Sequence, residues 1–369
     1  MPDTAFFWDE RTFWHGGGNF TFLTPVGGLV QPPAAGGLPE SPETKRRLVN
    51  LLRVTGLWEA LETRGADPAT REDLERVHPA GYLDQFKALS DAGGGEIGLR
   101  TPFGPGGFEI SALSAGLARA ALFSVLQGRH RTAYALSRPP GHHCLPDWPN
   151  GFCLLNNIAI AIEAARAAGL CRRPIVIDWD VHHGNGTEAI FYEDPDVLTV
   201  SIHQDRNYPL DTGDASARGK GSGEGANLNI PLPAGGGHDA YLYAMDRLVL
   251  PALNAHKPDV VIVACGFDAS GVDPLSRMLA GSNTFRALTQ AVLGAAEDHA
   301  NGRLLLVHEG GYSELHVPFC AHAVLEEMSG AEIRAPDPLA ARISAQQPDA
   351  KTSEWIRARI DTQAAAAGH

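Results

Sequence analysis

The chain has 369 residues, 44% of them hydrophobic and 20% charged, and its formal net charge is -13. This length suits one large α/β domain or two smaller ones, and the composition is ordinary for a globular enzyme. The excess of acidic residues argues against non-specific binding of nucleic acid and is compatible with a cationic substrate.

Strands and helices alternate along the first half of the chain. Residues 5–8 are predicted to form a strand, and a loop region rich in Gly and Pro then extends through residue 40. Pro42 suits the first turn of a helix. The elements predicted after it are a helix through residue 52, a helical stretch near 70–90 with a break at Pro79 and Gly81, a helix at 111–127, a strand at 132–136 and a helix at 153–168.

The second half continues this alternation. The predicted strands lie at 174–178, 197–203, 259–265 and 303–308, and the predicted helices at 240–255, 284–300, 319–329 and near 351–361, with a frayed Ala-rich end. No internal repeat and no linker-like change in composition interrupts the pattern. We therefore predict a single doubly wound α/β domain with a mainly parallel central sheet. The predicted domain covers 1–369, with a long N-terminal loop region at 1–40 and a C-terminal helical tail at 335–369.

The stretch from residue 175 to 186 concentrates chemistry at the end of one predicted strand. Its apolar start, Ile-Val-Ile, indicates a buried parallel strand. Asp178, Asp180, His182 and His183 follow directly, and residues two apart in a strand point the same way. Carboxylate and imidazole together suit zinc. The alternative interpretation is a polar strand end that leads into a solvated loop.

Other polar side chains also follow predicted strands. Because ligand sites in open α/β sheets lie at the carboxyl ends of the strands, these side chains are expected at one edge of the sheet. Asp180 and His182 are candidates for two metal ligands and Asp268 for a third, which leaves a position open for water or substrate. The polar residues that follow strands are His142, His143, Asp178 to His183, His203, Asp268 and Tyr312.

Several motifs taken together resemble the histone deacetylase family over about residues 40–330. The His-Gly-Asn-Gly-Thr form is similar to class II deacetylases and to bacterial histone deacetylase-like amidohydrolases, so the resemblance implies the arginase–deacetylase fold. The matching motifs are Arg138-Pro-Pro-Gly-His-His143, Gly151-Phe-Cys-Leu-Leu-Asn-Asn157, Asp178-Trp-Asp-Val-His-His-Gly-Asn-Gly-Thr187, Gly266-Phe-Asp268, Asp273-Pro-Leu275 and Glu309-Gly-Gly-Tyr312.

The resemblance implies a zinc-dependent removal of acetyl or other short acyl groups from acyl-lysine side chains. The implied zinc ligands are Asp180, His182 and Asp268. Tyr312 would donate a hydrogen bond to the oxyanion, and Gly310 would let that tyrosine move. The implied catalytic residues are His142, His143 and Tyr312, with Asp178 as the partner of His142 and Asn185 as the partner of His143. A carboxylate partner raises imidazole basicity, so we expect His142 to be protonated and His143 to be the neutral base.

Further sites are implied by the resemblance alone. Structural K⁺ or Na⁺ would bind at one site with Asp178, Asp180, His182 and Ser201, and at a second near Phe191, Asp194 and Val197. The substrate tunnel would be lined by Phe152, Tyr208, Leu275 and Gly310. Relatives often have phenylalanine at the position of Tyr208. The tyrosine hydroxyl therefore makes the tunnel rim of this chain differ in polarity from theirs.

Three alternative functions compete with this one. An arginase-like ureohydrolase needs a two-metal cluster, whereas Gly266-Phe-Asp-Ala-Ser270 offers one Asp. A binding module would have lost turnover, yet all the expected acid and base residues are present. The third alternative, an acetylpolyamine amidohydrolase, shares the chemistry but takes another substrate. The resemblance implies that relatives acting on polyamines select the second amine with an acidic residue at the tunnel mouth, at the position of Leu275 here; Glu109 is another candidate for that role.

The expected partners are a small-molecule or peptide substrate that bears acyl-lysine, and further copies of the chain in a homo-oligomer. We expect no nucleic-acid partner, because the chain is acidic. We expect no membrane, because no run of about 18 apolar residues occurs. The N-terminus lacks the pattern of a signal peptide. The five cysteines are odd in number and form no C-x-x-C pair, which indicates buried thiols in a reducing compartment such as the cytoplasm.

Overall fold

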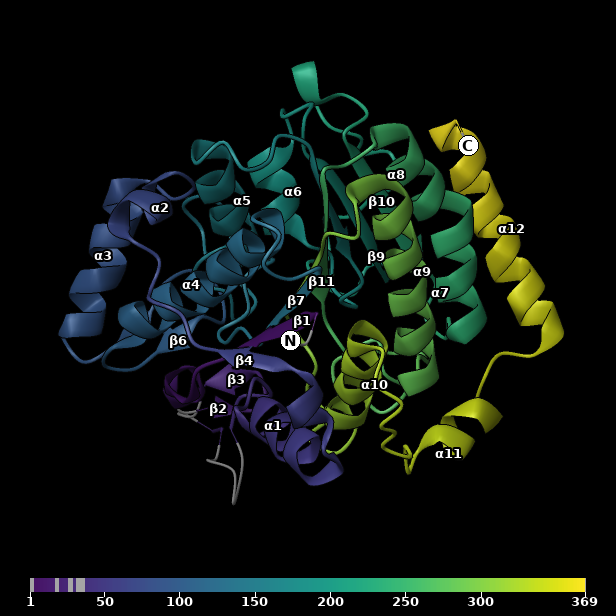
Figure 1. Ribbon diagram of the computed structural model, residues 1–369, viewed down its shortest axis with the longest axis horizontal. Helices are drawn as coiled ribbons and strands as arrows, with labels where there is room; N and C mark the ends of the chain where they lie inside the picture. Colours follow the sequence, from purple (N-terminus) through teal and green to yellow (C-terminus); the bar gives the residue numbers. More distant parts are fainter. Residues whose placement is uncertain (1–2, 17–19, 26–28, 31–36, 369) are drawn as a thin grey trace.

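One parallel sheet of eight strands runs through the protein, in the order β10-β9-β8-β11-β12-β7-β1-β4 (Figure 1). The computed structural model describes residues 3–16, 20–25, 29–30 and 37–368. The strands of the sheet are β1 (Thr4–Phe7), β4 (Glu62–Arg64), β7 (Thr132–Ala135), β8 (Pro174–Asp178), β9 (Leu198–Gln204), β10 (Asn227–Leu232), β11 (Val260–Cys265) and β12 (Leu304–His308). Two antiparallel pairs lie outside it, β2 (Phe20–Thr21) with β3 (Thr24–Pro25) and β5 (Gly95–Glu96) with β6 (Pro102–Phe103).

Helices cover both faces of this sheet (Figure 1). The helices are α1 (Glu43–Thr55), α2 (Arg71–Glu75), α3 (Ala80–Asp91), α4 (Gly107–Leu126), α5 (Asn157–Ala167), α6 (Asn185–Phe191), α7 (His238–Ala244), α8 (Leu250–His256), α9 (Ser282–Ala300), α10 (Val317–Ser329), α11 (Ala340–Ala345) and α12 (Ala350–Ala367). Residues of α4, α5 and α6 pack on one face, and residues of α1, α7 to α10 and α12 pack on the other. The doubly wound α/β prediction is therefore confirmed.

The apolar strands explain why the sheet lies in the middle. In β11, Val261 and Val263 belong to one core cluster, while Ile262 and Ala264 belong to the other. A strand that is buried on both faces reads as a continuous apolar run, which is why the pattern of the central strands was recognisable. Because helices from α1 to α12 are built around this one sheet, we propose that the chain forms a single domain over residues 1–369.

Some elements differ from the sequence predictions. β10 was not predicted because asparagines alternate with its apolar residues, and these asparagines are buried where they bond side chains of α6 and β9. α6 was read as a loop because Gly184 and Gly186 stand at its start. The helix expected from 153 begins only at Asn157, where the Asn156 side chain caps it. The Ala-rich end expected to fray is helical through Ala367.

The helix α4 is long and apolar enough to span a membrane by length and composition. However, 72% of its apolar window is buried inside the protein. Its side chains pack with α5 against the sheet. The apolar composition of α4 is therefore explained by its burial in the core.

Candidate active site

The segments that follow four parallel strands meet at the carboxyl edge of the sheet. His142 and His143 follow β7, the stretch from Asp178 to His183 ends β8, Asp268 follows β11, and Tyr312 follows β12. The strands bring these segments together because β7, β12, β11 and β8 are direct neighbours in the sheet. His203, the remaining polar residue of the predicted edge, lies within β9 and hydrogen-bonds Ser201 at 2.9 Å and the Gly213 carbonyl at 2.9 Å.

Asp180, His182 and Asp268 form a buried cluster whose ligand atoms all lie within 4.8 Å of one another. The His182 Nδ1 atom is 3.1 Å from Asp180 Oδ1 and 3.1 Å from Asp268 Oδ2. β8 ends at Asp178, so the strand geometry does not continue to Asp180 and His182. The expectation that these three residues share one strand face is therefore wrong. The chain then turns, so that Asp178 contacts His142 while the next two residues enter the cluster.

The backbone at Gly310 passes close to the carboxylate oxygens of the cluster. A Cβ atom at Gly310 would lie 2.3 Å from Asp268 Oδ2 and 2.6 Å from Asp180 Oδ2. A glycine is therefore required where the chain passes the two carboxylates, and its N–H donates to Asp180 Oδ2 at 2.8 Å. Two carboxylates and one imidazole are a donor set that zinc accepts, with a position left open for a reactant. The residues present fit that metal.

The electrostatics of the cluster favour a cation. Burial opposes charge on His182, but the Asp268 charge and the Asp180 carboxylate outweigh it and raise its pKa to about 10. Burial and the neighbouring Asp180 charge raise the pKa of Asp268 to about 6. The two carboxylates thus repel each other in a buried space, and a positive charge between them relieves that repulsion.

The two adjacent histidines have different partners. His142 Nδ1 donates to Asp178 Oδ2 at 2.9 Å, and His143 Nδ1 donates to Asn185 Oδ1 at 2.8 Å. Their rings lie 4.0 Å apart, and both are buried. These are the partners that the family resemblance implied.

The partners set the protonation of the two rings. Burial opposes charge on His142, but the negative charges of Asp180 and Asp178 raise its pKa to about 10. Burial and the positive charges of His142 and His182 lower the pKa of His143 well below its usual range. At neutral pH, the His142 imidazole is therefore charged. The His143 imidazole is neutral, and one of its ring nitrogens can accept a proton.

Glu309 supports the turn that carries these histidines, although the sequence analysis gave it no role. Its Oε2 atom accepts hydrogen bonds from Gly141 N at 2.7 Å and from His142 N at 3.1 Å. Burial raises the pKa of this carboxyl group to about 7. The only sequence signal was a charged residue directly after an apolar strand, in the Glu-Gly-Gly-Tyr segment.

A narrow tunnel of about 150 Å³ leads to the cluster. Phe152 and Tyr208 are two of its walls, and the Tyr208 ring meets the His143 ring edge-on at 5.0 Å. Gly151 is needed beside them, because a Cβ there would lie 2.4 Å from His143 Cδ2. The tunnel is lined by Leu23, Arg100, His143, Gly151, Phe152, His182, Asn207, Tyr208, Leu275 and Tyr312.

Polar contacts hold the Tyr208 wall in place. The Tyr208 hydroxyl donates to Asn150 Oδ1 at 3.1 Å, and Asn150 Nδ2 donates to the His143 carbonyl at 2.6 Å. Leu275 lies at the tunnel, where its carbonyl accepts from Asn207 Nδ2 at 3.0 Å. Asn150 was missed by the sequence analysis, since an asparagine in a loop gives no signal of such a contact.

Tyr312 closes another side of the tunnel, with its ring centroid 5.7 Å from that of Phe152. Its backbone N–H donates to Asp273 Oδ2 at 2.8 Å, so the buried Asp273 fixes the start of this loop. Burial and the charges of Asp268 and Asp180 keep the pKa of Tyr312 well above its usual range. The hydroxyl therefore remains a hydrogen-bond donor at neutral pH.

The residues expected at monovalent cation sites have other contacts in the structure. Ser201 pairs with Asp178 in the β8–β9 register, but its hydroxyl bonds His203. Asp194 forms an ion pair with Arg166 at 2.6 Å. Phe191 and Val197 contribute side chains to the core, and the Phe191 carbonyl accepts from Asp194 N at 2.9 Å.

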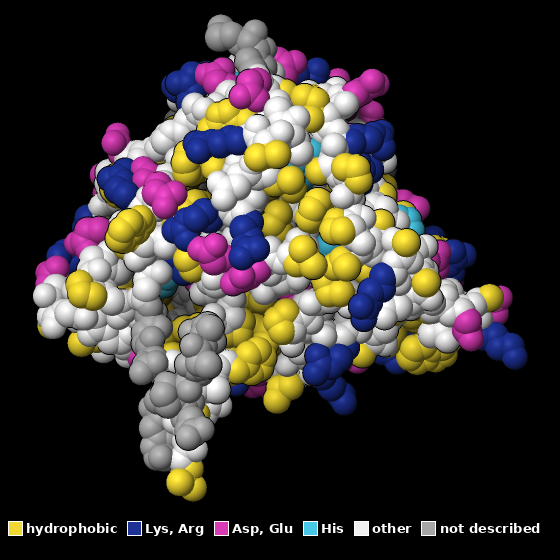
Figure 2. Space-filling model, turned by 90° about the horizontal axis from the view of Figure 1, so that it is seen from below, with side chains coloured by type: hydrophobic (Ala, Val, Ile, Leu, Met, Phe, Trp, Pro, Cys, Tyr) yellow, Lys and Arg dark blue, Asp and Glu magenta, His cyan; other side chains and the backbone are white. Residues whose placement is uncertain are grey.

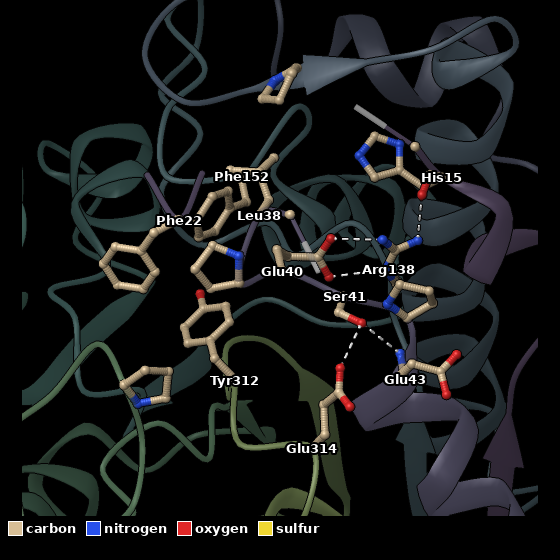
Figure 3. Close-up of a pocket in the computed structure, with 16 residues that line it drawn as sticks. His15, Phe22, Leu38, Glu40, Ser41, Glu43, Arg138, Phe152, Tyr312 and Glu314 are labelled. Atoms are coloured by element: carbon tan, nitrogen blue, oxygen red, sulfur yellow. Dashed lines mark hydrogen bonds and ion pairs between the residues drawn. The ribbon is translucent and has the colours of Figure 1, made fainter. Parts of the chain in front are cut away.

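A larger cavity of about 710 Å³ adjoins the tunnel behind Phe152 and Tyr312 (Figure 3). On its far side, Arg138 forms a two-point ion pair with Glu40, at 3.0 Å for each contact. Lys45 approaches the same carboxylate at 3.4 Å, and all three side chains are buried. Burial opposes charge on Glu40, but the Arg138 and Lys45 charges outweigh it and lower its pKa to about 2.

Replacing Glu40 with glutamine should destabilise the protein, because it leaves Arg138 and Lys45 buried without a counter-charge. The expected loss is about 3 kcal/mol of unfolding free energy, measured by urea denaturation. In the native protein, the contribution of Glu40 to stability is present above its unfolded pKa of about 4.3 and is lost as the pH falls toward 2. Glu43→Gln, at a half-exposed ion pair with Arg46, is the control and should cost less than about 1 kcal/mol. Equal losses in both variants would contradict this prediction.

Comparisons with known proteins agree with the geometry. The profile of a family described as "Histone deacetylase domain" matches residues 38–328. A histone deacetylase-like amidohydrolase of Pseudomonas aeruginosa is 57% identical over 99% of this chain and 96% of its own length. Histone deacetylase 8 of Arabidopsis thaliana is 36% identical over 81% of this chain and 80% of its own length. A crystal structure titled "HDA15 HD domain" superposes with a TM-score of 0.80 at 29% identity, covering 98% of both chains.

Proposed function

The chain belongs to the histone deacetylase family and is a hydrolase of that family, and we propose that it deacylates acyl-lysine side chains with zinc. The observation that carries this proposal is the buried Asp180, His182 and Asp268 cluster at the end of a tunnel whose walls include Phe152, Tyr208 and Leu275. A cavity of about 150 Å³ is narrow, and it suits an acyl chain on a flexible alkyl stem better than a bulky ligand.

The side chains around the cluster divide the work of amide hydrolysis. Zinc held by Asp180, His182 and Asp268 would supply a Lewis acid for the acyl carbonyl and lower the pKa of water. The neutral His143 would take a proton from the attacking water and pass it to the leaving amine. His142, charged and held by Asp178, stabilises negative charge that develops beside it, and the Tyr312 hydroxyl donates to the oxyanion.

The test is an activity panel with the purified enzyme. We expect release of acetate and free amine from an acetyl-lysine peptide, loss of that activity after chelation, and recovery with added zinc. Metal analysis of the untreated enzyme should give one zinc per chain. Turnover that survives complete removal of metal would contradict the proposed mechanism, and the absence of amide hydrolysis on all acyl-lysine peptides would contradict the proposed substrate.

The tunnel mouth favours acyl-lysine over acetylpolyamines. Leu275 lines it, and Glu109, the other candidate for a gatekeeper, forms an ion pair with Lys87 at 3.1 Å and does not line the tunnel. A carboxylate about 5 Å from a second ammonium would contribute roughly 3 kcal/mol at an effective dielectric near 20, and less after screening. Without that carboxylate, a polyamine gains nothing over an alkyl amide.

Leu275→Glu should therefore shift the ratio of kcat/KM values toward acetylspermidine and acetylputrescine. The expected shift is roughly three- to tenfold relative to an acetyl-lysine peptide, after solvent screening. Leu275→Gln is the matched control, because it adds the same length and polarity without the charge. A clear preference of the unmodified enzyme for acetylpolyamines would overturn the substrate assignment in favour of an acetylpolyamine amidohydrolase.

Partners and location remain part of the proposal. Acidic and basic side chains are interspersed with apolar ones on the face seen in Figure 2, and this mixture supports a protein without a nucleic-acid partner.

Exposed Val54 and Leu315 border an apolar surface between α1 and α10, which supports self-association, to be measured by light scattering. Five free, buried thiols support a cytoplasmic location. Structural K⁺ or Na⁺ near Asp178 is to be tested by the dependence of activity on these ions.

A further inference from the structure

Arg100 brings a positive charge to the mouth of the substrate tunnel. The described residues that line the tunnel include Arg100 but no lysine, aspartate, glutamate or second arginine. Its guanidinium lies over the ring of Tyr208, with its central carbon 5.5 Å from the ring centroid. A guanidinium stacked on an aromatic wall is directed by that wall and keeps its N–H groups available at the edges.

The backbone fixes Arg100 against the tunnel. Arg100 has φ 58°, in the left-handed region that a non-glycine residue adopts only where its surroundings require it. Its carbonyl accepts a hydrogen bond from Phe152 N at 3.0 Å, and the Leu99 carbonyl accepts from Gly151 N at 3.1 Å. The segment that carries the cation is thus joined by two hydrogen bonds to the loop that forms the opposite wall.

The charge of Arg100 is not neutralised within the described part of the chain. None of the ion pairs there includes Arg100, and Glu109 pairs with Lys87. The Tyr208 hydroxyl below it already donates to Asn150. The formal net charge of -13 would by itself repel an acidic substrate, so a local preference for one would have to come from this arginine.

We propose that Arg100 is a specificity-determining residue that binds a carboxylate next to the acyl-lysine of a peptide substrate. This inference rests on the proposed deacylase function. When the acyl-lysine side chain enters the tunnel, the peptide backbone lies across the mouth and its neighbouring side chains come within reach of the guanidinium. Arginine binds a carboxylate through two parallel N–H···O contacts, which a neutral amide of the same shape cannot match. The enzyme therefore prefers acyl-lysine in an acidic sequence context.

The test compares three acetyl-lysine peptides that differ only at the residues on either side of the acetyl-lysine, which are Asp, Asn or Lys. Asp and Asn have the same shape, so their ratio of kcat/KM values isolates the charge. The unmodified enzyme should favour the Asp peptide by about two- to fivefold over the Asn peptide, the range of an exposed ion pair, and the preference should fall with salt. Arg100→Gln should bring the ratio of the two kcat/KM values close to one, whatever its effect on the turnover of both peptides.

Arg206→Gln is the matched control, because Arg206 is an exposed arginine with a left-handed φ of 51° that does not line the tunnel. This variant should keep the preference of the unmodified enzyme. Equal turnover of the Asp and Asn peptides by the unmodified enzyme, or an unchanged ratio in Arg100→Gln, would overturn the inference and leave the deacylase function intact. Absence of turnover on all three peptides would overturn both.

Discussion

Asp180→Ala and Asp268→Ala should each abolish deacetylation and release the zinc. A zinc site with one ligand removed retains two protein ligands, which rarely hold the ion tightly. The effect should be larger than that of any other substitution in the tunnel, because it removes the Lewis acid and not one hydrogen bond. The two readouts are zinc per chain after gel filtration and kcat/KM on an acetyl-lysine peptide.

A control is needed because both carboxylates also hold the backbone. Asp268 Oδ1 accepts from Val181 N at 2.8 Å, and Asp180 accepts from Gly310 N at 2.8 Å, so alanine leaves buried donors without partners. Asp268→Asn can keep the first of these bonds while it removes the negative charge. It should retain most of the stability in thermal unfolding and still lose zinc affinity and turnover. Full zinc occupancy with normal turnover in Asp180→Ala or Asp268→Ala would remove these residues from the metal site.

Much of the fold was predictable because the central strands are buried on both faces. β8, β11 and β12 are apolar runs, and a polar residue with obvious chemistry stands at the end of each or within three residues after it. The edge strands gave no such signal. β10 alternates asparagine with apolar residues, and the side chains of these asparagines donate hydrogen bonds to Glu188 of α6. The partners are about 40 residues apart in the sequence, so no local pattern encodes the contact.

The supporting residues of the site were harder to predict than the reactive ones. Asp180 and His182 stand out by residue type and position. Glu309, Asp273 and Asn150 act by accepting or donating hydrogen bonds to the backbone of distant loops, as Glu309 does for His142 across a separation of 167 residues. Such contacts depend on the tertiary arrangement of the loops, whereas periodicity and spacing report only local structure.

Tyr312→Phe should retain the zinc and the fold but lose roughly 10²–10³ in turnover, the usual effect of removing one oxyanion donor. The hydroxyl makes no hydrogen bond to any described residue, so its removal leaves no partner unsatisfied within that part of the protein. It lies near the proposed zinc ligands, because a Cβ at Gly310 would lie 3.1 Å from the hydroxyl oxygen and 2.3 Å from Asp268 Oδ2. The loss should therefore appear in kcat, with the thermal midpoint nearly unchanged.

Tyr208→Phe is the matched control, since it removes a hydroxyl from another wall of the same tunnel. That hydroxyl is already engaged as a donor to Asn150, so its loss should change kcat by only a few-fold. If Tyr312 stabilises the oxyanion, the two variants should differ by at least about tenfold in kcat while both bind one zinc. A decrease of less than about threefold in Tyr312→Phe would remove Tyr312 from the mechanism, because an oxyanion donor acts where charge develops and cannot be lost without slowing that step.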